Sequence, residues 1–328
     1  MGSTRWSDDH YKERDTVRKA TATPTFAYHA DVASGKVAKE AHPSLNPHGV
    51  KVRECRDSDT HPESRAVAVL MDVTGSMHTV PKMIQAALPK LMGLLIRKNY
   101  LEHPAILVGA IGDATCDTVP LQVGQFESGI EIENDLTNLY LEGGGGGHIT
   151  ESYELGMYFI ARHTAMDCWE KRQFKGFLFL IGDEIPYPQI NPKEVQKLIG
   201  DVVQDGISTK ELVEELREKW DVYYIMPKMT AHWNEKAILD PWKALLGQNV
   251  LLLEDPNAIC ELIASTIGVA EGNRDIAGIE DDLISAGTSA STARAVGKAL
   301  VPVAEGARHK GAAMTVPSSG KGSGLATL

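Results

Sequence analysis

The middle of the chain, from residue 65 to about residue 270, alternates apolar runs of strand length with stretches whose apolar residues recur at helical spacing. Such alternation is typical of a mostly parallel sheet that is covered by helices on both faces. The run "GFLFLIGDE" is continuously apolar up to its acidic end, which is typical of a buried central strand. About six strands are predicted, with interleaved helices that include one over residues 150–162. The sequence therefore predicts an α/β fold with a doubly wound, mostly parallel central sheet flanked by helices.

The two ends of the chain lack this alternation. Residues 1–64 are polar, and Pro, Ser, His and Thr interrupt every periodic run, which predicts an extended N-terminal arm with at most short elements. Residues 271–328 are rich in Gly, Ala and Ser, which predicts a flexible tail with one weak helix near residues 290–300. Because few apolar residues are present to offset the entropy cost of ordering, we expect the core domain, residues 65–270, to fold without either end.

Composition excludes several classes of function. The 328 residues carry a formal net charge of −11, without the clustered Lys and Arg that nucleic-acid binding requires. No apolar run approaches the roughly 20 residues that span a bilayer, and the N-terminus lacks the apolar segment of a secretory signal. The four cysteines form no Cys-x-x-Cys pair, which favours reduced thiols. We therefore expect a cytoplasmic protein that neither binds nucleic acid nor spans a membrane.

Three of the strongest predicted strands end in acidic residues, namely Asp72, Asp113 and Asp183. In an open parallel sheet, ligands bind beyond the carboxyl ends of the strands. A glycine-rich stretch, "LEGGGGGHITES" at residues 141–152, falls between two of these strands, and its five consecutive glycines allow the backbone to pass close to a ligand. The sequence thus predicts a small polar surface at one edge of the sheet.

The turn after the first of these strands carries hydroxyl groups beside its acid. The stretch "DVTGSM" places Asp72, Thr74 and Ser76 at alternate positions. One hydroxyl here would serve as the cap of the following helix, but capping does not explain a carboxylate directly at the strand end. A hard cation such as Mg²⁺ needs about six oxygen ligands, and this single turn offers three neighbouring oxygen-bearing side chains.

The same stretch resembles the Asp-x-Ser-x-Ser signature of the metal-ion-dependent adhesion site (MIDAS) in von Willebrand factor A-type (VWA) domains. The resemblance covers residues 65–270, and the order of metal loop, glycine-rich loop and acid-terminated strand agrees with it. It implies that Asp72, Thr74 and Ser76 bind Mg²⁺ or Mn²⁺, with Asp183 held to the metal through a water molecule.

The second loop departs from the family pattern. VWA domains usually offer a Thr after two glycines as a further metal ligand, and here Thr150 lies two residues later than that position. The resemblance therefore implies Thr150 as a ligand, with Glu151 and His148 as alternatives for the same place.

The resemblance also implies a function. In VWA domains the metal keeps an open coordination position that a partner's carboxylate fills, so we expect a protein-binding module and no enzymatic activity. Intracellular bacterial VWA domains resemble partners of MoxR-type AAA+ ATPases, which implies an adaptor or assembly factor. A Mg²⁺-dependent phosphohydrolase is the alternative, but Thr74 stands where that class needs a second Asp. A structural subunit of a large assembly is a further alternative.

Overall fold

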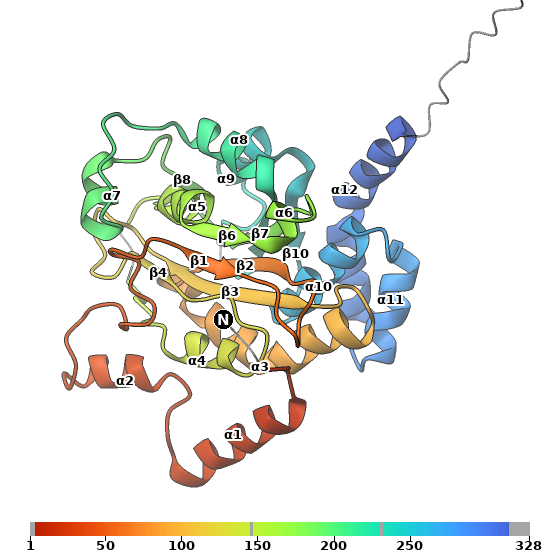
Figure 1. The fold of residues 1–328 in the computed structure, drawn as a ribbon, viewed down its shortest axis with the longest axis horizontal. Coiled ribbons are helices and arrows are strands. Elements are labelled where there is room, and N and C mark those ends of the chain that lie inside the picture. The colour runs from red at the N-terminus through yellow and green to blue at the C-terminus, as the bar shows by residue number, and fades with distance from the viewer. Residues whose placement is uncertain (1–3, 145–146, 230–231, 315–328) are drawn as a thin grey trace, which may run out of the picture.

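Strand β2 (Arg65–Asp72) lies inside a six-stranded sheet. The computed structural model describes residues 4–144, 147–229 and 232–314, with Ser76 and residues 307–314 described by their backbone alone (Figure 1). The strand order is β10-β9-β7-β2-β3-β4, and all neighbours are parallel except β3 and the edge strand β4. These strands are β3 (Pro104–Ile111), β4 (Leu121–Val123), β7 (Gly176–Ile181), β9 (Trp220–Pro227) and β10 (Val250–Leu253). The predicted mostly parallel sheet is confirmed.

Alternate residues of β2 point to opposite faces of the sheet, as the period of two in a strand requires. Val69 and Met71 join one buried cluster, and Ala68 and Leu70 join the other. The first cluster includes residues of α3 (Val80–Met92), α4 (Glu131–Thr137), α10 (Ile259–Ala270), α11 (Ile276–Ser285) and α12 (Ala290–Met314). The second includes α5 (Tyr153–Arg162), α6 (Asp167–Glu170), α7 (Pro192–Leu198), α8 (Thr209–Lys219) and α9 (Lys236–Leu246). The sheet therefore lies between two helical layers (Figure 1).

Two short parallel ladders lie outside the main sheet. Strand β1 (Arg53–Cys55) pairs with β6 (Thr164–Met166), and β5 (Thr150–Glu151) pairs with β8 (Ile185–Pro186). The helix predicted over residues 150–162 consequently begins only at Tyr153, because the two residues of β5 are extended and paired with β8. The remaining short helices are η1 (Gly75–Thr79), η2 (Gly93–Arg97), η3 (Gly247–Asn249) and η4 (Pro256–Ala258).

The N-terminal arm contains helix α1 (Asp8–Thr21), so the expectation of at most short elements is wrong for these 14 residues. No residue of α1 is buried, and polar contacts hold the helix in place. The Arg18 guanidinium lies 2.7 Å from the carboxylate of Glu133, whose side chain is 1% exposed. The Tyr11 hydroxyl donates a hydrogen bond of 2.8 Å to a backbone carbonyl of α3. Local composition does not reveal these contacts, because the partners lie 115 and 74 residues away in the sequence.

Apolar side chains of the arm also enter the core. Phe26, just before α2 (Ala27–Ala33), and Leu45 are both buried in the cluster on the first face of the sheet. Their burial contributes hydrophobic stabilisation of roughly 1.5–3 kcal/mol per side chain. The arm is thus packed on the domain rather than extended beside it.

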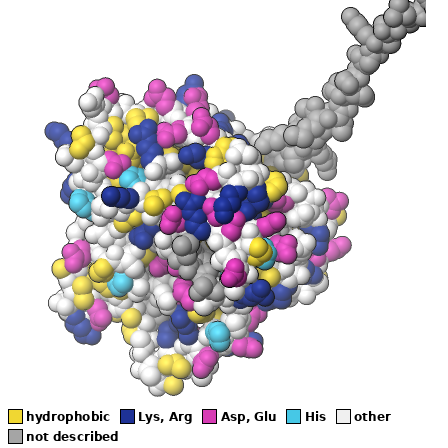
Figure 2. Space-filling view, in the orientation of Figure 1, with side chains coloured by type: hydrophobic (Ala, Val, Ile, Leu, Met, Phe, Trp, Pro, Cys, Tyr) yellow, Lys and Arg dark blue, Asp and Glu magenta, His cyan; other side chains and the backbone are white. Residues whose placement is uncertain are grey.

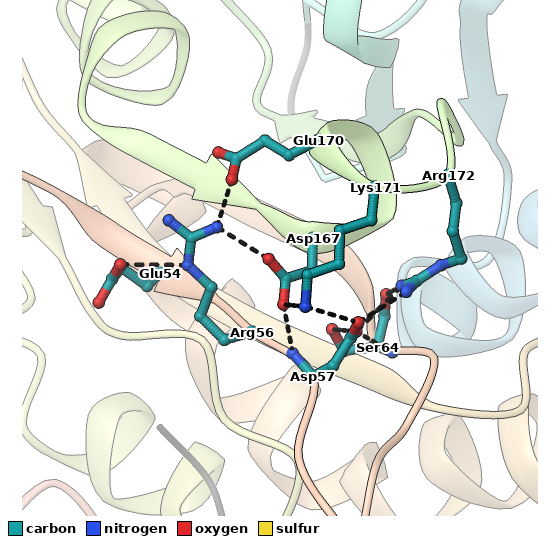
Figure 3. Close-up of polar contacts among 8 residues, drawn as sticks. All are labelled: Glu54, Arg56, Asp57, Ser64, Asp167, Glu170, Lys171 and Arg172. Carbon is teal, nitrogen blue, oxygen red and sulfur yellow. Dashed lines mark hydrogen bonds and ion pairs between the residues drawn. The ribbon is translucent and has the colours of Figure 1, made fainter.

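A network of ion pairs joins the end of the arm to α6 (Figure 3). Arg56 lies 2.9 Å from Asp167 and also contacts Glu170. Asp57 lies 2.7 Å from Arg172 and also accepts hydrogen bonds from the backbone and the hydroxyl of Ser64. These contacts join segments that are more than 100 residues apart in the sequence. They hold the residues that precede β2 against α6 and the turn that follows it.

The helix predicted near residues 290–300 is confirmed as part of α12, whereas the flexible tail predicted around it is wrong for α11, which forms a packed helix. Helices α11 and α12 pack on α10, and Leu283 of α11 is fully buried. In α12, Val296 and Leu300 are also fully buried, and Ala293 and Val303 continue the same stripe at spacings of three and four residues. The high Ala, Gly and Ser content concealed how far this helical period extends beyond residue 300. The part of the tail prediction that concerns residues 315–328 lies outside the described residues.

Charged side chains of both signs are interspersed over the face that Figure 2 shows, with no single basic field on it. Within the described ranges, no helix combines the length and the apolar character that crossing a lipid bilayer requires.

Candidate metal centre

The order of the strands reverses between β2 and β7, because β3 and β4 lie on one side of this pair and β9 and β10 on the other. In open α/β sheets, loops diverge at such a point and leave a crevice beyond the carboxyl ends of the strands. Asp72 is the last residue of β2, and Asp183 and Glu184 follow β7 after one intervening glycine. Since Met71 pairs with Ile181, the two strands bring these acids to the same part of the edge.

The Thr74 side chain connects two carboxylates in this crevice. Its hydroxyl oxygen lies 2.8 Å from Oδ1 of Asp72 and 2.9 Å from Oε1 of Glu151. A hydroxyl has one hydrogen and can donate to only one of these oxygens. The backbone N–H of Thr74 also donates to Oδ1 of Asp72, at 2.7 Å. The second close oxygen–oxygen contact therefore needs either a proton on a carboxylate or a cation that both groups share.

Strand β5 explains why Glu151, rather than Thr150, faces this crevice. Successive residues of a strand point to opposite sides, and β5 is fixed by its register with β8, in which Thr150 pairs with Ile185 and Glu151 with Pro186. The Thr150 hydroxyl accordingly lies 2.9 Å from Nδ1 of His148, on the other side of the loop. Of the three residues that the sequence left open, the structure places Glu151 beside Asp72 and Thr74.

The carboxylates of the crevice, those of Asp72, Glu151, Asp183 and Glu184, form no ion pair with Lys or Arg in the described part of the chain. Burial, followed by the charges of Asp72 and Glu184, raises the pKa of Glu151 from 4.5 to about 10. Burial and then the charge of Asp183 raise the pKa of Glu184 to about 7. The pKa of Asp72 is also raised well above its usual range by burial and by its acidic neighbours, against the hydrogen bonds from Thr74.

Two buried carboxylate oxygens of this group have no hydrogen-bond partner among the described residues, namely Oε2 of Glu151 and Oε2 of Glu184. Glu151 is only 2% exposed. An unsatisfied buried carboxylate oxygen costs free energy, and bound protons or a cation remove that cost. The donor set consists entirely of carboxylate and hydroxyl oxygens, which are the ligands of hard divalent cations. The residues present therefore fit such a cation.

Three aromatic side chains, those of Tyr153, Tyr224 and Trp242, pack beside the residues that follow β7. The rings of Tyr224 and Trp242 stack at 4.0 Å, and the Tyr224 hydroxyl and the Trp242 indole N–H both donate to the backbone carbonyl of Glu184, at 3.1 and 2.8 Å. The Tyr153 ring packs edge-on against both rings, and its hydroxyl lies 3.4 Å from Oδ2 of Asp72. These three buried rings pack together, and two of them hold the backbone of Glu184 by hydrogen bonds.

The glycine-rich loop lies against the turn that follows β2. Gly75 has φ +43° and donates its N–H to the carbonyl of Gly144 at 2.5 Å, and Gly143, with φ +66°, donates to the carbonyl of Val73 at 3.1 Å. Both glycines use left-handed backbone conformations that other residues adopt at a cost. The sequence prediction that this loop meets the strand-end acids agrees with these contacts. Ser76 lies in η1, and its side chain is not described.

A second group of ligand-bearing side chains lies at the end of β3. Asp113, Cys116 and His148 each bring one possible ligand atom to within 4.8 Å of the others. The sequence predicts Asp113 as a strand-end acid and His148 as an alternative metal ligand. It assigns no role to Cys116, nor to Glu184 of the first group. The pattern of an acid at a strand end followed by a thiol three residues later, "DATC", is the local feature that marks Cys116.

Comparisons with known proteins give no family for this chain, since no protein-family model and no curated protein matches it. Among solved structures, the chain is similar to the pilus adhesin SpaC from Lactobacillus rhamnosus GG in an open conformation, at 8% identity and a TM-score of 0.45, over 65% of this chain. It is also similar to proximal thread matrix protein 1 from the mussel byssus, at 10% identity and a TM-score of 0.40, over 66% of this chain. The matches span 31% and 47% of those two proteins, respectively.

Proposed function

We propose that this protein is a cation-dependent protein-binding module that holds Mg²⁺ or Mn²⁺ between the ends of β2 and β7. A doubly wound arrangement of VWA type is part of the proposal. The strand order β10-β9-β7-β2-β3-β4, which reverses between β2 and β7, supports it. So does the position of Asp72, which the resemblance assigns to the metal and which ends β2 at that point.

The observation that carries the proposal is the contact of the Thr74 hydroxyl with both Asp72 and Glu151, together with the unpartnered oxygens of Glu151 and Glu184. Asp72, Thr74 and Glu151 would hold the cation, which supplies the positive charge that this buried group lacks. Asp183 would assist through water, and Ser76 is a further ligand by the resemblance. Thr150 has a different partner and is not part of this proposed ligand set.

Charge limits how a partner reaches the metal. If all four carboxylates gathered here were ionised, they would carry more negative charge than a divalent ion neutralises. An acidic side chain of a partner therefore binds by replacing one of them rather than by adding to them. Glu151 suits this exchange, because it comes from the two-residue strand β5 beside the glycine-rich loop. The partner would be a protein with an exposed acid, and an adaptor role beside a MoxR-type AAA+ ATPase stays the more specific proposal from the resemblance.

The proposal assigns the site no catalytic role, because Thr74 stands where a phosphate-transferring site of this kind needs a second Asp. Hydrolysis of ATP or of a phosphate ester that disappears in Asp72→Asn would contradict that assignment.

Isothermal titration calorimetry with Mg²⁺ tests the site. We expect the protein to bind one ion and Asp72→Ala to weaken binding at least about tenfold, which corresponds to about 1.4 kcal/mol. Glu214→Ala, on the exposed side of α8, is the matched control and should bind as the unmodified chain does. Unchanged Mg²⁺ affinity in a folded Asp72→Ala protein would overturn the proposal.

A second experiment tests partner binding. The full chain, immobilised in Mg²⁺ or in EDTA, is exposed to native extract beside its Asp72→Ala variant. A partner retained by the site should appear only with the unmodified chain in Mg²⁺. A partner that the variant retains equally in EDTA would place the contact elsewhere on the molecule.

A further inference from the structure

The group formed by Asp113, Cys116 and His148 joins three kinds of ligand atom at one place: a carboxylate oxygen, a thiol sulfur and an imidazole nitrogen. Asp113 follows β3 and is fully buried, Cys116 lies in the exposed turn after it, and His148 comes from the end of the glycine-rich loop. The group uses none of the side chains that the proposed Mg²⁺ or Mn²⁺ site uses.

Neighbouring groups orient two of the three side chains. Oδ1 of Asp113 accepts hydrogen bonds from the backbone N–H and the hydroxyl of Thr115, both at 2.8 Å. Oδ2 lies 3.0 Å from Nε2 of His148. The other ring nitrogen, Nδ1, lies 2.9 Å from the Thr150 hydroxyl, which accepts its hydrogen when Nε2 is unprotonated. Hydrogen bonds of this kind behind a carboxylate and an imidazole are typical of the groups that position metal ligands.

We propose that Asp113, Cys116 and His148 bind Zn²⁺, with water in the fourth coordination position. Zinc takes sulfur, nitrogen and oxygen ligands in one tetrahedral site, and three protein ligands with one water is a common arrangement. A thiolate and a carboxylate together balance the charge of the ion. Bonds of 2.0–2.3 Å place neighbouring ligand atoms roughly 3.3–3.7 Å apart. The separation of Asp113 and His148 therefore opens by a few tenths of an ångström on binding, and the exposed Cys116 side chain closes over the ion.

This assignment also gives Thr150 a role. The residue that the VWA resemblance implied as a ligand of the hard cation instead orients His148 for a softer one. The alternative explanation is that His148 and Asp113 form only an ion pair that holds the loop. An ion pair does not involve the thiol of Cys116, whereas a zinc site does, so the behaviour of this thiol distinguishes the two.

The reactivity of Cys116 tests the proposal directly, because Cys116 is the exposed cysteine of the chain and Cys55, Cys168 and Cys260 are buried. The full chain is treated with EDTA, freed of the chelator and labelled with an aromatic disulfide reagent, with and without Zn²⁺. We expect Zn²⁺ to slow labelling at least tenfold, Mg²⁺ to leave the rate unchanged, and Cys116→Ser to remove the reactive thiol.

Variants assign the protection to the three residues. His148→Ala and Asp113→Asn should each lose most of the protection by Zn²⁺, and His148 is exposed enough for its variant to fold. Asp72→Ala should keep the protection, which separates this proposal from the Mg²⁺ or Mn²⁺ site. Co²⁺ provides an independent readout, since a bound thiolate gives a charge-transfer absorption that Cys116→Ser should lack.

Labelling that is equally fast with and without Zn²⁺ would overturn the proposal. Protection that persists in both the His148 and the Asp113 variants would overturn it as well, as would a cobalt–thiolate absorption that survives in Cys116→Ser.

Discussion

Glu151 and its neighbour Thr150 lie on opposite sides of β5, and only Glu151 faces the crevice. Its carboxylate is buried, lies 2.9 Å from Thr74, and keeps one oxygen without a hydrogen-bond partner among the described residues. Thr150 contacts His148 instead. Because the two residues are adjacent in β5, a substitution at either one changes the same strand but on opposite sides. The two variants can therefore be compared directly.

We predict that Glu151→Gln weakens Mg²⁺ binding at least tenfold, because the amide removes one negative charge from the cation's surroundings. The same variant should raise the free energy of unfolding of the metal-free protein at pH 7 by at least about 1 kcal/mol, because burial raises the pKa of Glu151 to about 10, so this residue must take up a proton on folding and the amide need not. Calorimetry gives the first quantity and urea unfolding in EDTA gives the second.

Thr150→Val is the matched control, and its Mg²⁺ affinity should stay within about twofold of the unmodified chain, well below the tenfold step of 1.4 kcal/mol. If Thr150→Val lost binding and Glu151→Gln kept it, the ligand implied by the resemblance would be right and the role assigned to Glu151 would be wrong.

At the scale of the elements, the composition of α12 predicts a weak helix but understates its length and its packing. Its stripe of apolar side chains contacts α10, β10 and α11, and Leu300 in the middle of the stripe is fully buried. The next residue, Val301, is 40% exposed. Substitutions at Leu300 and Val301 therefore distinguish how much the packed face and the helix propensity of α12 each contribute to the free energy of unfolding.

We predict that Leu300→Ala lowers the free energy of unfolding by about 2–5 kcal/mol, from lost burial and a residual cavity. Val301→Ala should change it by less than about 0.5 kcal/mol, as is usual for surface positions. Urea unfolding followed by circular dichroism measures both. Equal, small effects of the two variants would show that α12 adds little to the stability of the domain.

For the whole molecule, the buried acids connect pH, metal and stability. Glu151 and Glu184 bind protons more tightly in the folded state, since burial raises the pKa of Glu151 from 4.5 to about 10 and that of Glu184 to about 7. Above pH 4.5 the unfolded chain releases these protons while the folded protein keeps them. A group that binds more protons when folded makes stability fall as pH rises. Its stabilising effect is thus present below pH 4.5 and is lost as pH rises toward about 10.

We therefore predict that the metal-free protein loses stability between about pH 5 and pH 9, and that Mg²⁺ stabilises it more at the higher pH, because the cation then replaces fewer protons. Urea unfolding at about pH 5, 7 and 9, in EDTA and in Mg²⁺, measures this dependence. A Glu151→Gln, Glu184→Gln double variant is the reference, and its stability should depend less on pH. The same pH dependence in the double variant and the unmodified chain would contradict the prediction.

The sequence alone determined the sheet and the acids at its edge. Continuous apolar runs such as that of β7 predict buried parallel strands, and the carboxyl ends of parallel strands share one edge. The sequence pattern alone therefore places Asp72 and Asp183 at the same edge. These features are local or follow from topology.

The tertiary structure decided what depends on contacts between distant segments. The choice of Glu151 over Thr150 follows from the register of β5 with β8, and a shift of one residue would exchange their sides. The position of α1 depends on the pairing of Arg18 with Glu133, 115 residues away, and the proximity of Cys116 to His148 depends on how two loops meet. Neither composition nor periodicity encodes such pairings, because the free energy that selects them arises only when both segments are already in place.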